Sequence, residues 1–166
     1  MIVLPMKPEH WNAVKEIYEE GIATGNATFE TSAPSWEKWN ESHLSFARII
    51  AAEENYSPGI LGWAALSKVS DRCVYAGVAE VSVYVKSSAR GRGIGSVLLA
   101  ALIKESEAND IWTLTAGIFP ENISSIHIHE KAGFRIIGRR ERIGKMKGKW
   151  RDTLQFERRS NIVGID

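Results

Sequence analysis

The sequence predicts one α/β domain, 1–166, with a mixed and mostly antiparallel sheet flanked by helices. Short β runs and amphipathic helical runs follow one another in the order β-α-α-β-β-β-α-β-α-β-β. Three consecutive β runs in the front half favour antiparallel strands. The composition, 44% hydrophobic and 25% charged residues, is typical of a globular domain with a sizeable core. Because no repeat or Pro/Gly/Ser-rich linker interrupts the chain, no second domain is expected.

The first elements are a strand, a helix and a loop. A short strand is expected at 2–4, and Pro8 opens a helix that stops near Gly21. The buried face of this helix, at the i, i+3 and i+4 spacing, is Trp11, Val14, Ile17 and Tyr18. Residues 24–34 are small and polar around Phe29, which predicts a loop with an apolar anchor.

A second helix and most of the sheet follow this loop. Ser35 caps the helix, whose apolar positions are Trp36, Trp39 and Leu44. The strands expected from alternation and flanking turns are 49–53, 60–66, 78–85, 113–119, 134–143 and 150–158. The turn residues expected between strands are Ser57, Pro58 and Gly59, and later Gly144 and Gly148. A glycine-rich loop, 87–93, leads into an amphipathic helix with apolar positions Ile94, Val97, Leu98, Ala101 and Leu102. Asn122 begins a last helix that ends at Gly133.

Several classes of protein are excluded by composition and charge. The longest apolar runs are about five or six residues, against the roughly 20 of a membrane helix. Pro5, Lys7 and Glu9 stand where a signal peptide needs an apolar core. The charge is 21 − 20 = +1, which provides no field for nucleic acid or anionic lipid. The single cysteine, Cys73, fits a reducing compartment, so a cytoplasmic protein is expected.

A candidate phosphate site lies between strand 78–85 and the next helix. It consists of Arg90, Gly91, Arg92, Gly93, Ile94, Gly95 and Ser96. Glycines let successive backbone N–H groups converge, and the helix start adds unbonded donors and the positive end of its dipole. A dinucleotide-binding fingerprint needs Gly or Ala at the place of Ser96, and a Walker loop needs Gly-Lys-Ser/Thr. A phosphate or pyrophosphate site remains, with a basic turn that only caps the helix as the alternative.

The spacing Arg90-x-x-Gly93-x-Gly95 resembles the Q/R-x-x-G-x-G/A signature of the GCN5-related N-acetyltransferases. The resemblance implies that family's fold and acetyl-CoA as acetyl donor, with its pyrophosphate on this loop. It also implies that the main chain of Val83, Tyr84 and Val85 binds the pantetheine arm. The alternative is a central strand without this role, which would have the same side-chain pattern. The stretch 122–134 resembles the family's N-x-x-S/A-x-x-x-Y-x-K-x-G-F element. This likeness implies cofactor contacts by Asn122, Ser125 and Lys131. The alternative for Asn122 is a helix N-cap, and the alternative for Lys131 is a solvated position at the helix end.

Two titratable residues are candidates for catalysis. Glu80 lies inside an apolar β run, where a carboxylate is costly unless it is paired or used, and it can take a proton from an attacking amine. The alternative is a polar strand face, and a β-bulge in this strand, usual in the family, would change which face each residue meets. His129 stands where the family commonly has a tyrosine that protonates the departing thiolate. His127 and His129 point about 200° apart on a helix, so no metal site is expected.

Wider stretches are similar to the phosphinothricin N-acetyltransferase branch of the family. The matching segments run from Arg72 through Tyr75 to Val85, from Ala27 to Thr31, and from Gly148 to Asp152. The likeness covers nearly the whole chain. Val74, Val78 and the stretch 69–71 differ from the residues that are usual in this branch. It implies a homodimer that acetylates the α-amine of a small amino-acid analogue, such as phosphinothricin, methionine sulfoximine or methionine sulfone.

An α-amino acid acceptor needs a cation near its carboxylate and a carboxylate near its amine. Arg72 is expected to supply the cation, unless it is a solvated turn residue, and Glu80 the carboxylate. The other residues assigned to the acceptor are Phe29, Glu30, Tyr75, Val81 and Ser82, with loop anchoring as the alternative for Phe29. Two further readings stay open: a non-catalytic acyl-CoA-binding module, and an acetyltransferase for another amine or a protein.

Overall fold

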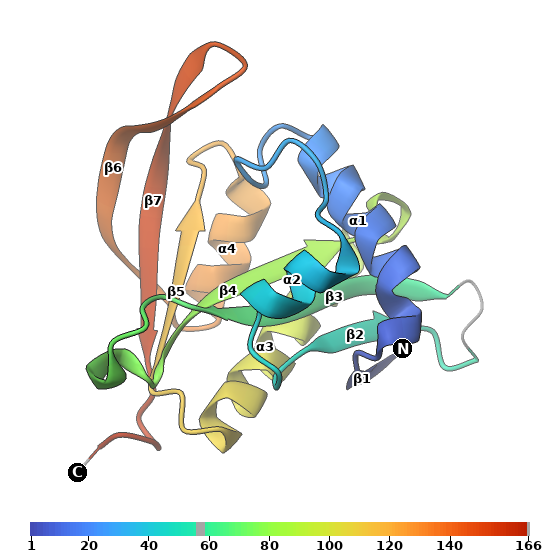
Figure 1. The fold of residues 1–166 in the computed structure, drawn as a ribbon, viewed down its shortest axis with the longest axis horizontal. Helices are drawn as coiled ribbons and strands as arrows, with labels where there is room; N and C mark the ends of the chain where they lie inside the picture. The colour runs from blue at the N-terminus through green and yellow to red at the C-terminus, as the bar shows by residue number, and fades with distance from the viewer. Residues whose placement is uncertain (56–58, 166) are drawn as a thin grey trace.

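The protein, in a computed structural model that describes residues 1–55 and 59–165, is built on one sheet. Within these residues seven strands lie in the order β1-β2-β3-β4-β5-β7-β6 (Figure 1). They are β1 (Ile2–Pro5), β2 (Ile49–Ala52), β3 (Ile60–Lys68), β4 (Val78–Val85), β5 (Thr113–Ile118), β6 (Arg135–Met146) and β7 (Lys149–Arg159). All neighbours pair antiparallel except β4 and β5, which are parallel. The prediction of a mixed, mostly antiparallel sheet is confirmed.

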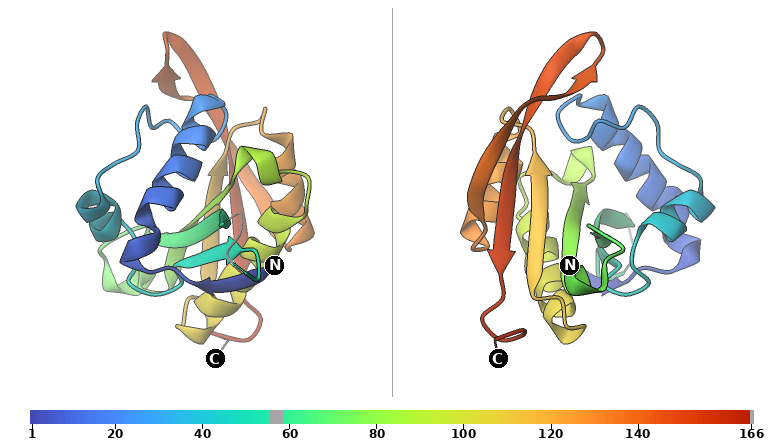
Figure 2. Two further views of the ribbon diagram at one scale, coloured as in Figure 1. Left: turned by 90° about the vertical axis from the view of Figure 1, so that its right-hand side faces the viewer. Right: turned by 60° about the vertical axis from the view of Figure 1, so that its left-hand side comes forward.

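Helices cover both faces of the sheet. In the described chain they are α1 (Trp11–Ala23), α2 (Trp36–Ser42), α3 (Ile94–Ala108) and α4 (Ile123–Lys131). Figure 2 shows α1 and α2 on one face, and α3 and α4 on the other. Val14, Ile17 and Trp39 pack against Ile50 and Trp63 on the first face. On the second face α3 packs on inward residues of β2 to β5 and of β7. Burial of these apolar faces is the main term that holds the layers together.

The parallel strands β4 and β5 separate soon after they start. Their register pairs are Val78–Thr113, Ala79–Leu114 and Glu80–Thr115. Beyond Glu80, β4 continues beside β3, while β5 continues beside β7. Main-chain groups of 81–85 that point away from β3 therefore have no strand partner among the described residues. This open strand edge forms the wall of the site described below.

Three predicted helix details are wrong. α1 begins at Trp11, because Pro8–His10 form a separate 3₁₀ turn. α2 ends at Ser42, and Leu44 lies beyond it, where its N–H bonds to a carbonyl of β3. Val97 is 39% exposed, since α3 is covered along a different stripe. The residues that α3 buries are Ile94, Leu98, Leu99, Leu102, Ile103 and Ser106.

The irregular part of the sheet is β6, not β4. β4 keeps one constant register against β3, so the bulge that is usual in the family is absent from this pairing. The register of β6 against β7 shifts twice, once between Ile136 and Gly138 and again between Arg140 and Gly144. Gly144 lies within the strand and not in the turn, which is formed by Lys147 and Gly148 with φ of 47° and 79°. Such left-handed turns suit the twist of a two-residue hairpin.

Ser57 and Pro58 of the predicted turn between β2 and β3 lie outside the described residues. The third residue of that turn, Gly59, is described and has a left-handed φ of 103°. No helix in the described part of the chain is long and apolar enough to cross a bilayer. The same residues contain no group of three or more His, Cys, Asp or Glu side chains that could hold a metal ion.

Candidate active site

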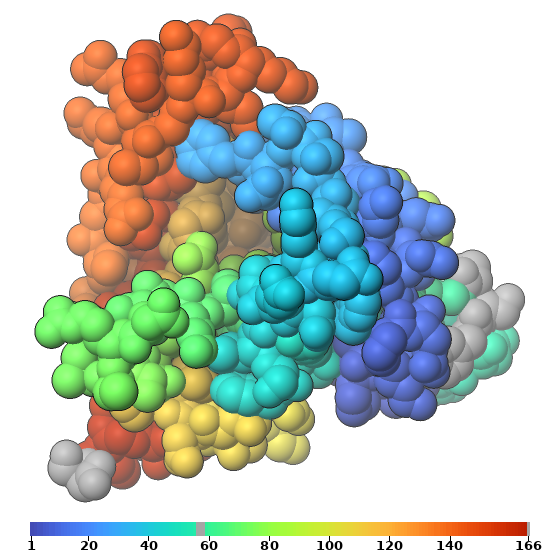
Figure 3. Space-filling model, viewed as in Figure 1, coloured from blue at the N-terminus to red at the C-terminus, as the bar shows by residue number. Residues whose placement is uncertain are grey.

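Two adjoining cavities open where β4 and β5 separate. The first, of about 710 Å³, contains the glycine-rich loop in its wall and is called here the glycine-loop cavity. The second, of about 450 Å³, contains Glu80 and is called the Glu80 cavity. Figure 3 shows a hollow at the Glu80 cavity, between the β6–β7 hairpin and the loop after α1. The residues that line both cavities are Ala27, Val83, Tyr84, Asn122 and Ser125. A molecule that extends through both would pass along the open edge of β4.

The glycine-loop cavity has the geometry of an anion site. Gly93 is the residue before α3, and Gly91 and Gly93 both have φ of 77°, a left-handed conformation that glycine adopts without strain. Unbonded N–H groups and the positive dipole end at the start of α3 meet the cavity here. The predicted cofactor residues that line it are Val83, Tyr84, Val85, Arg90, Gly91, Gly93, Ile94, Gly95, Ser96, Asn122 and Ser125.

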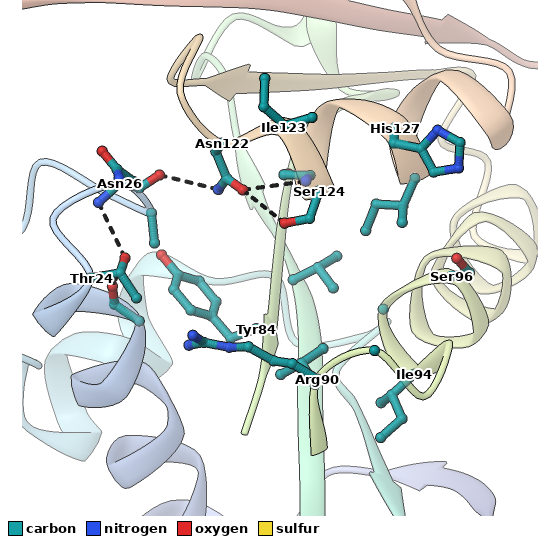
Figure 4. Close-up of a pocket in the computed structure, with 18 of the residues that line it drawn as sticks. Thr24, Asn26, Tyr84, Arg90, Ile94, Ser96, Asn122, Ile123, Ser124 and His127 are labelled. Carbon is teal, nitrogen blue, oxygen red and sulfur yellow. Dashed lines mark hydrogen bonds between the residues drawn. The ribbon is translucent and has the colours of Figure 1, made fainter. Parts of the chain in front are cut away.

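Two predicted cofactor residues lie outside both cavities. Arg92 Nη2 is 2.7 Å from Glu53 Oε1, in a salt bridge directed away from the cavity wall. Lys131 is exposed at the last residue of α4. The arginines of the loop thus divide their roles, because only Arg90 faces the cavity. Figure 4 shows Arg90 and Tyr84 below the start of α4.

Asn122 has a structural role that the N-cap alternative anticipated. Its Oδ1 accepts the N–H of Ser125 and the hydroxyl of Ser124, both at 3.3 Å. Its Nδ2 donates to the carbonyl of Asn26 at 3.1 Å, so it also ties α4 to the loop after α1 (Figure 4). The same loop contributes Thr24 and Asn26 to the cavity wall, and the sequence contains no signal that would place them there.

Tyr84 stands between the two cavities. Its ring is stacked on Trp63, with centroids 4.8 Å apart and planes at 14°. Tyr18 meets the ring edge-on, also at 4.8 Å. On the side of α1 the ring lies against Gly21, where an added Cβ would come within 2.6 Å of it. Burial raises the pKa of the Tyr84 phenol, which therefore stays protonated and is a hydrogen-bond donor near neutral pH.

The Glu80 cavity contains most of the predicted acceptor residues. Those that line it are Phe29, Glu30, Glu80, Val81 and Ser82, and the predicted catalytic residue His129 lines it too. Arg72 and Tyr75 do not line it: both are exposed in the turn before β4, with the guanidinium 5.7 Å from the centre of the Tyr75 ring. The cation that does line the cavity is Arg140 of β6, which the sequence analysis missed. The sequence of this strand is typical of a solvated hairpin, and no local pattern distinguishes Arg140 from the neighbouring residues.

Glu80 has the environment of a base. The constant register of β4 places Glu80, Ser82 and Tyr84 on the face toward α1, and the alternating valines on the face toward α3. The side chain remains accessible from the cavity. Burial raises its pKa, and the charge of Arg140 lowers it by a smaller amount. Because no salt bridge to Glu80 is formed within the described chain, its carboxylate is available to a ligand.

His129 is held in a way that disfavours the predicted acid role. It is 3% exposed, and its Nδ1 lies 2.8 Å from the carbonyl oxygen of Ser125, to which it must donate. The Nε2 atom is buried with no partner in the described chain. Burial lowers the pKa of the imidazole, so the neutral ring with an unprotonated Nε2 is favoured. A neutral ring held in this way accepts a proton more readily than it donates one.

The loop that carries Phe29 and Glu30 is anchored by Arg151. Its guanidinium donates to the Gly25 carbonyl at 2.9 Å and to Asn26 Oδ1 at 2.8 Å. It also lies 4.2 Å from the ring centre of Phe119. Phe29 packs edge-on against the same ring, with centroids 4.8 Å apart. The segment from Gly148 to Asp152 thus has a structural role: it positions one wall of the Glu80 cavity.

Comparison with known proteins gives one consistent family. Residues 6–154 match the model of the acetyltransferase (GNAT) domain. The chain is 32% identical over 161 residues to phosphinothricin N-acetyltransferase of Streptomyces coelicolor, covering 94% of each chain. It is 36% identical over 139 residues to the L-methionine sulfoximine/L-methionine sulfone acetyltransferase of Pseudomonas aeruginosa, covering 82% of this chain and 81% of the relative.

A solved structure agrees with these relatives. The phosphinothricin acetyltransferase of Sinorhizobium meliloti in complex with AcCoA superposes with a TM-score of 0.89 at 26% identity, covering 99% of this chain and 91% of that one. The fold, the open edge of β4 and the glycine loop are therefore explained together. The chain belongs to the GNAT family and is an acetyltransferase.

Proposed function

We propose that this protein transfers the acetyl group of acetyl-CoA to the α-amine of a small amino-acid analogue of the phosphinothricin, methionine sulfoximine or methionine sulfone type. The observation that carries the proposal is the junction of the two cavities, where an anion-binding loop continues into a pocket containing an available carboxylate. The activities for which the relatives are named support the class of acceptor.

The glycine-loop cavity fits the donor. Consecutive N–H groups at 91–95 and the charge of Arg90 suit a pyrophosphate. The open main-chain edge of Val83, Tyr84 and Val85 suits the amides of a pantetheine arm, because an unpaired strand edge accepts such bonds. Asn122 and Ser125 line the passage between the cavities and complete the set of proposed contacts. The donor supplies an activated acetyl thioester.

Glu80 is the proposed general base. The acceptor enters as an ammonium ion and must lose a proton before its nitrogen is nucleophilic. The Glu80 carboxylate takes this proton, directly or through a water, and its raised pKa makes it a better base. The amine nitrogen then bonds to the acetyl carbon as the carbon–sulfur bond breaks, and the sulfur leaves with the electron pair. The second proton of the nitrogen passes to solvent or to the departing thiolate, which leaves a neutral amide. A thiolate is an adequate leaving group near neutral pH, so the step does not depend on His129 as an acid.

The Glu80 cavity also has the shape features of a small acceptor site. Phe29 provides an aromatic wall that is fixed from behind by Phe119. Glu30 lies in the same wall and provides a second carboxylate for an ammonium ion. Val81 and Ser82 line the β4 side of the cavity. The predicted contact of Arg72 and Tyr75 with the acceptor stays a prediction, since neither residue reaches the cavity within the described chain.

The proposal includes a homodimer in the cytoplasm. The outer strand β6 supports the dimer, because it presents the exposed apolar residues Ile136 and Ile137 on a long unpaired edge. Sedimentation at several protein concentrations tests the dimer, and cell fractionation tests the compartment. A concentration-independent monomer would contradict the first, and recovery outside the cytosol the second.

An acceptor screen tests the function. The protein is supplied with acetyl-CoA and a panel of amino acids with their sulfoximine, sulfone and phosphinate analogues, and free thiol is followed over time. We expect turnover with one of the analogues and an acetylated α-amine in the product by mass spectrometry. Turnover only with polyamines or peptide amines would move the acceptor to another class. Donor binding without transfer to any amine would indicate a non-catalytic acyl-CoA-binding module.

A further inference from the structure

Arg140 is the one arginine of the described β6–β7 hairpin that lines the Glu80 cavity, and its guanidinium has no carboxylate partner there. Four arginines of this hairpin are paired: Arg135 with Glu157, Arg139 with Asp152, Arg151 with Glu121 and Arg158 with Glu107. The guanidinium of Arg140 makes no salt bridge or hydrogen bond within residues 1–55 and 59–165. Arg140 lines the Glu80 cavity instead. A guanidinium left free at a cavity wall is available to an anionic ligand.

The irregular register of β6 directs Arg140 into the cavity. Arg140 lies opposite Thr153 of β7, and both residues line the cavity. The next register pair is Gly144 with Arg151, so three residues of β6 oppose Asp152 alone. The Asp152 carboxylate accepts the N–H of Arg142 at 2.7 Å and the Nε of Arg139 at 2.8 Å, which holds this bulge in place.

The bulge has a consequence for the cavity wall. In a regular strand, residues 140 and 143 would face opposite sides of the sheet, since side chains alternate. Here Arg140 and Ile143 both line the Glu80 cavity. The hairpin therefore contributes a cation and an apolar surface side by side, and Gly144 closes against Phe29, where a Cβ would lie 2.6 Å from the ring.

The charges of the Glu80 cavity match a zwitterion. Glu30 and Glu80 provide negative charge from the loop after α1 and from β4, and Arg140 is the one full positive charge among its described lining residues. Arg140 acts on Glu80 electrostatically but forms no salt bridge with it. Because the two charges stay apart, each is open to the opposite charge of a ligand that lies between them.

We propose that Arg140 is the carboxylate-binding residue of the acceptor site, in the place that the sequence analysis assigned to Arg72. This assignment rests on the proposed function. The acceptor would lie with its α-carboxylate on the guanidinium of Arg140 and its amine toward Glu80 and Glu30. A planar guanidinium can bind both oxygens of a carboxylate at once, which fixes the orientation of the amine as well as the affinity.

The test compares Arg140→Gln with wild type on two acceptors, methionine sulfone and its decarboxylated amine. We expect KM for the amino acid to rise roughly 10- to 150-fold, the range of a charge-assisted contact. KM for acetyl-CoA and for the decarboxylated amine should change less than threefold, roughly, because neither needs this contact. Arg140→Lys, which keeps the charge but loses the fork, should fall between the two enzymes. Arg142→Gln removes an equal charge from the same bulge outside the cavity and is the matched control.

Binding is measured separately from turnover. Calorimetric titration of methionine sulfone into the protein saturated with coenzyme A should show binding to wild type and a matching loss in Arg140→Gln. This measurement distinguishes failure of the proposed transfer from failure of the Arg140 assignment. If the protein is inactive but wild type binds the amino acid better than Arg140→Gln does, only the proposed transfer is disproved. Equal effects on both acceptors, a loss seen in Arg72→Gln but not in Arg140→Gln, or no binding of the amino acid to wild type would each overturn the assignment.

Discussion

The substitution Glu80→Gln separates proton transfer from binding. Glutamine keeps the size and shape of the side chain but cannot take a proton from an ammonium ion at neutral pH. The Glu80 side chain has no hydrogen bond or salt bridge with the described residues that the change would break. Stability should therefore stay within about 0.5 kcal/mol of wild type, and the loss should fall on the rate.

The expected loss follows from the role of a general base. Such groups contribute typically about 10²–10⁴-fold, which corresponds to about 2.7–5.5 kcal/mol of barrier at 1.36 kcal/mol per tenfold. The KM for acetyl-CoA should change little, because the proposed donor site is the glycine-loop cavity, which Glu80 does not line. A loss in this range with an unchanged donor KM would support the role of Glu80 in the chemical step.

The pH dependence of the rate provides an independent test of Glu80 as the general base. The active form of Glu80 is the carboxylate, and its pKa lies above the ordinary value because burial outweighs the charge of Arg140. The wild-type kcat/KM should therefore fall as the pH drops through this raised pKa. Glu80→Gln should lack this limb, and its deficit should shrink at alkaline pH, where more of the amine is already neutral. Arg140→Gln should move the limb to higher pH, since it removes the one charge that lowers the Glu80 pKa.

The assay is thiol release across a pH series, with saturating donor and with acceptor varied from below to above its KM, so that kcat and kcat/KM are both obtained. Glu130→Gln, an exposed position of α4 outside both cavities, is the matched control and should behave as wild type. Thermal unfolding of each variant shows whether the fold is intact. A folded Glu80→Gln protein with wild-type kcat and an unchanged acid limb would refute the argument and leave Glu80 as a structural residue.

Three further substitutions test the walls of the site. Gly93→Asp should abolish acetyl-CoA binding, measured by calorimetry, because it adds a negative charge to the anion site. Gly93→Asn adds a neutral side chain of the same size as Asp that tolerates the φ of 77°, so this variant should still bind. Equal binding by both variants would contradict the assignment of an anion site. Gly144→Ala places a Cβ 2.6 Å from the Phe29 ring, so the ring must shift. The acceptor KM should rise while the donor KM stays unchanged, and an unaltered acceptor KM would contradict the contact. His129→Ala should lower kcat less than Glu80→Gln does, and a larger loss would exchange their roles.

The strand, loop and helix from β4 to α3 were predictable because their signals are local. Alternation from Val78 to Val85 defines the strand, and glycines at 91 and 93 define a loop that needs left-handed backbone angles. An anion site made of neighbouring N–H groups is contained within a few residues, so it can be predicted from them alone. The face that carries Glu80 follows from alternation in the same way, provided the strand has no bulge.

The sequence by itself thus determined the strand and the glycine loop that line the glycine-loop cavity, and the identity of the candidate base. The tertiary structure alone placed Arg140, and not Arg72, in the wall of the cavity that contains Glu80. These residues come from separate elements, and their meeting depends on how far β4 and β5 diverge and on the bulge held by Asp152. Neither feature leaves a periodic trace along the chain, because strand separation and register are set by packing between distant segments.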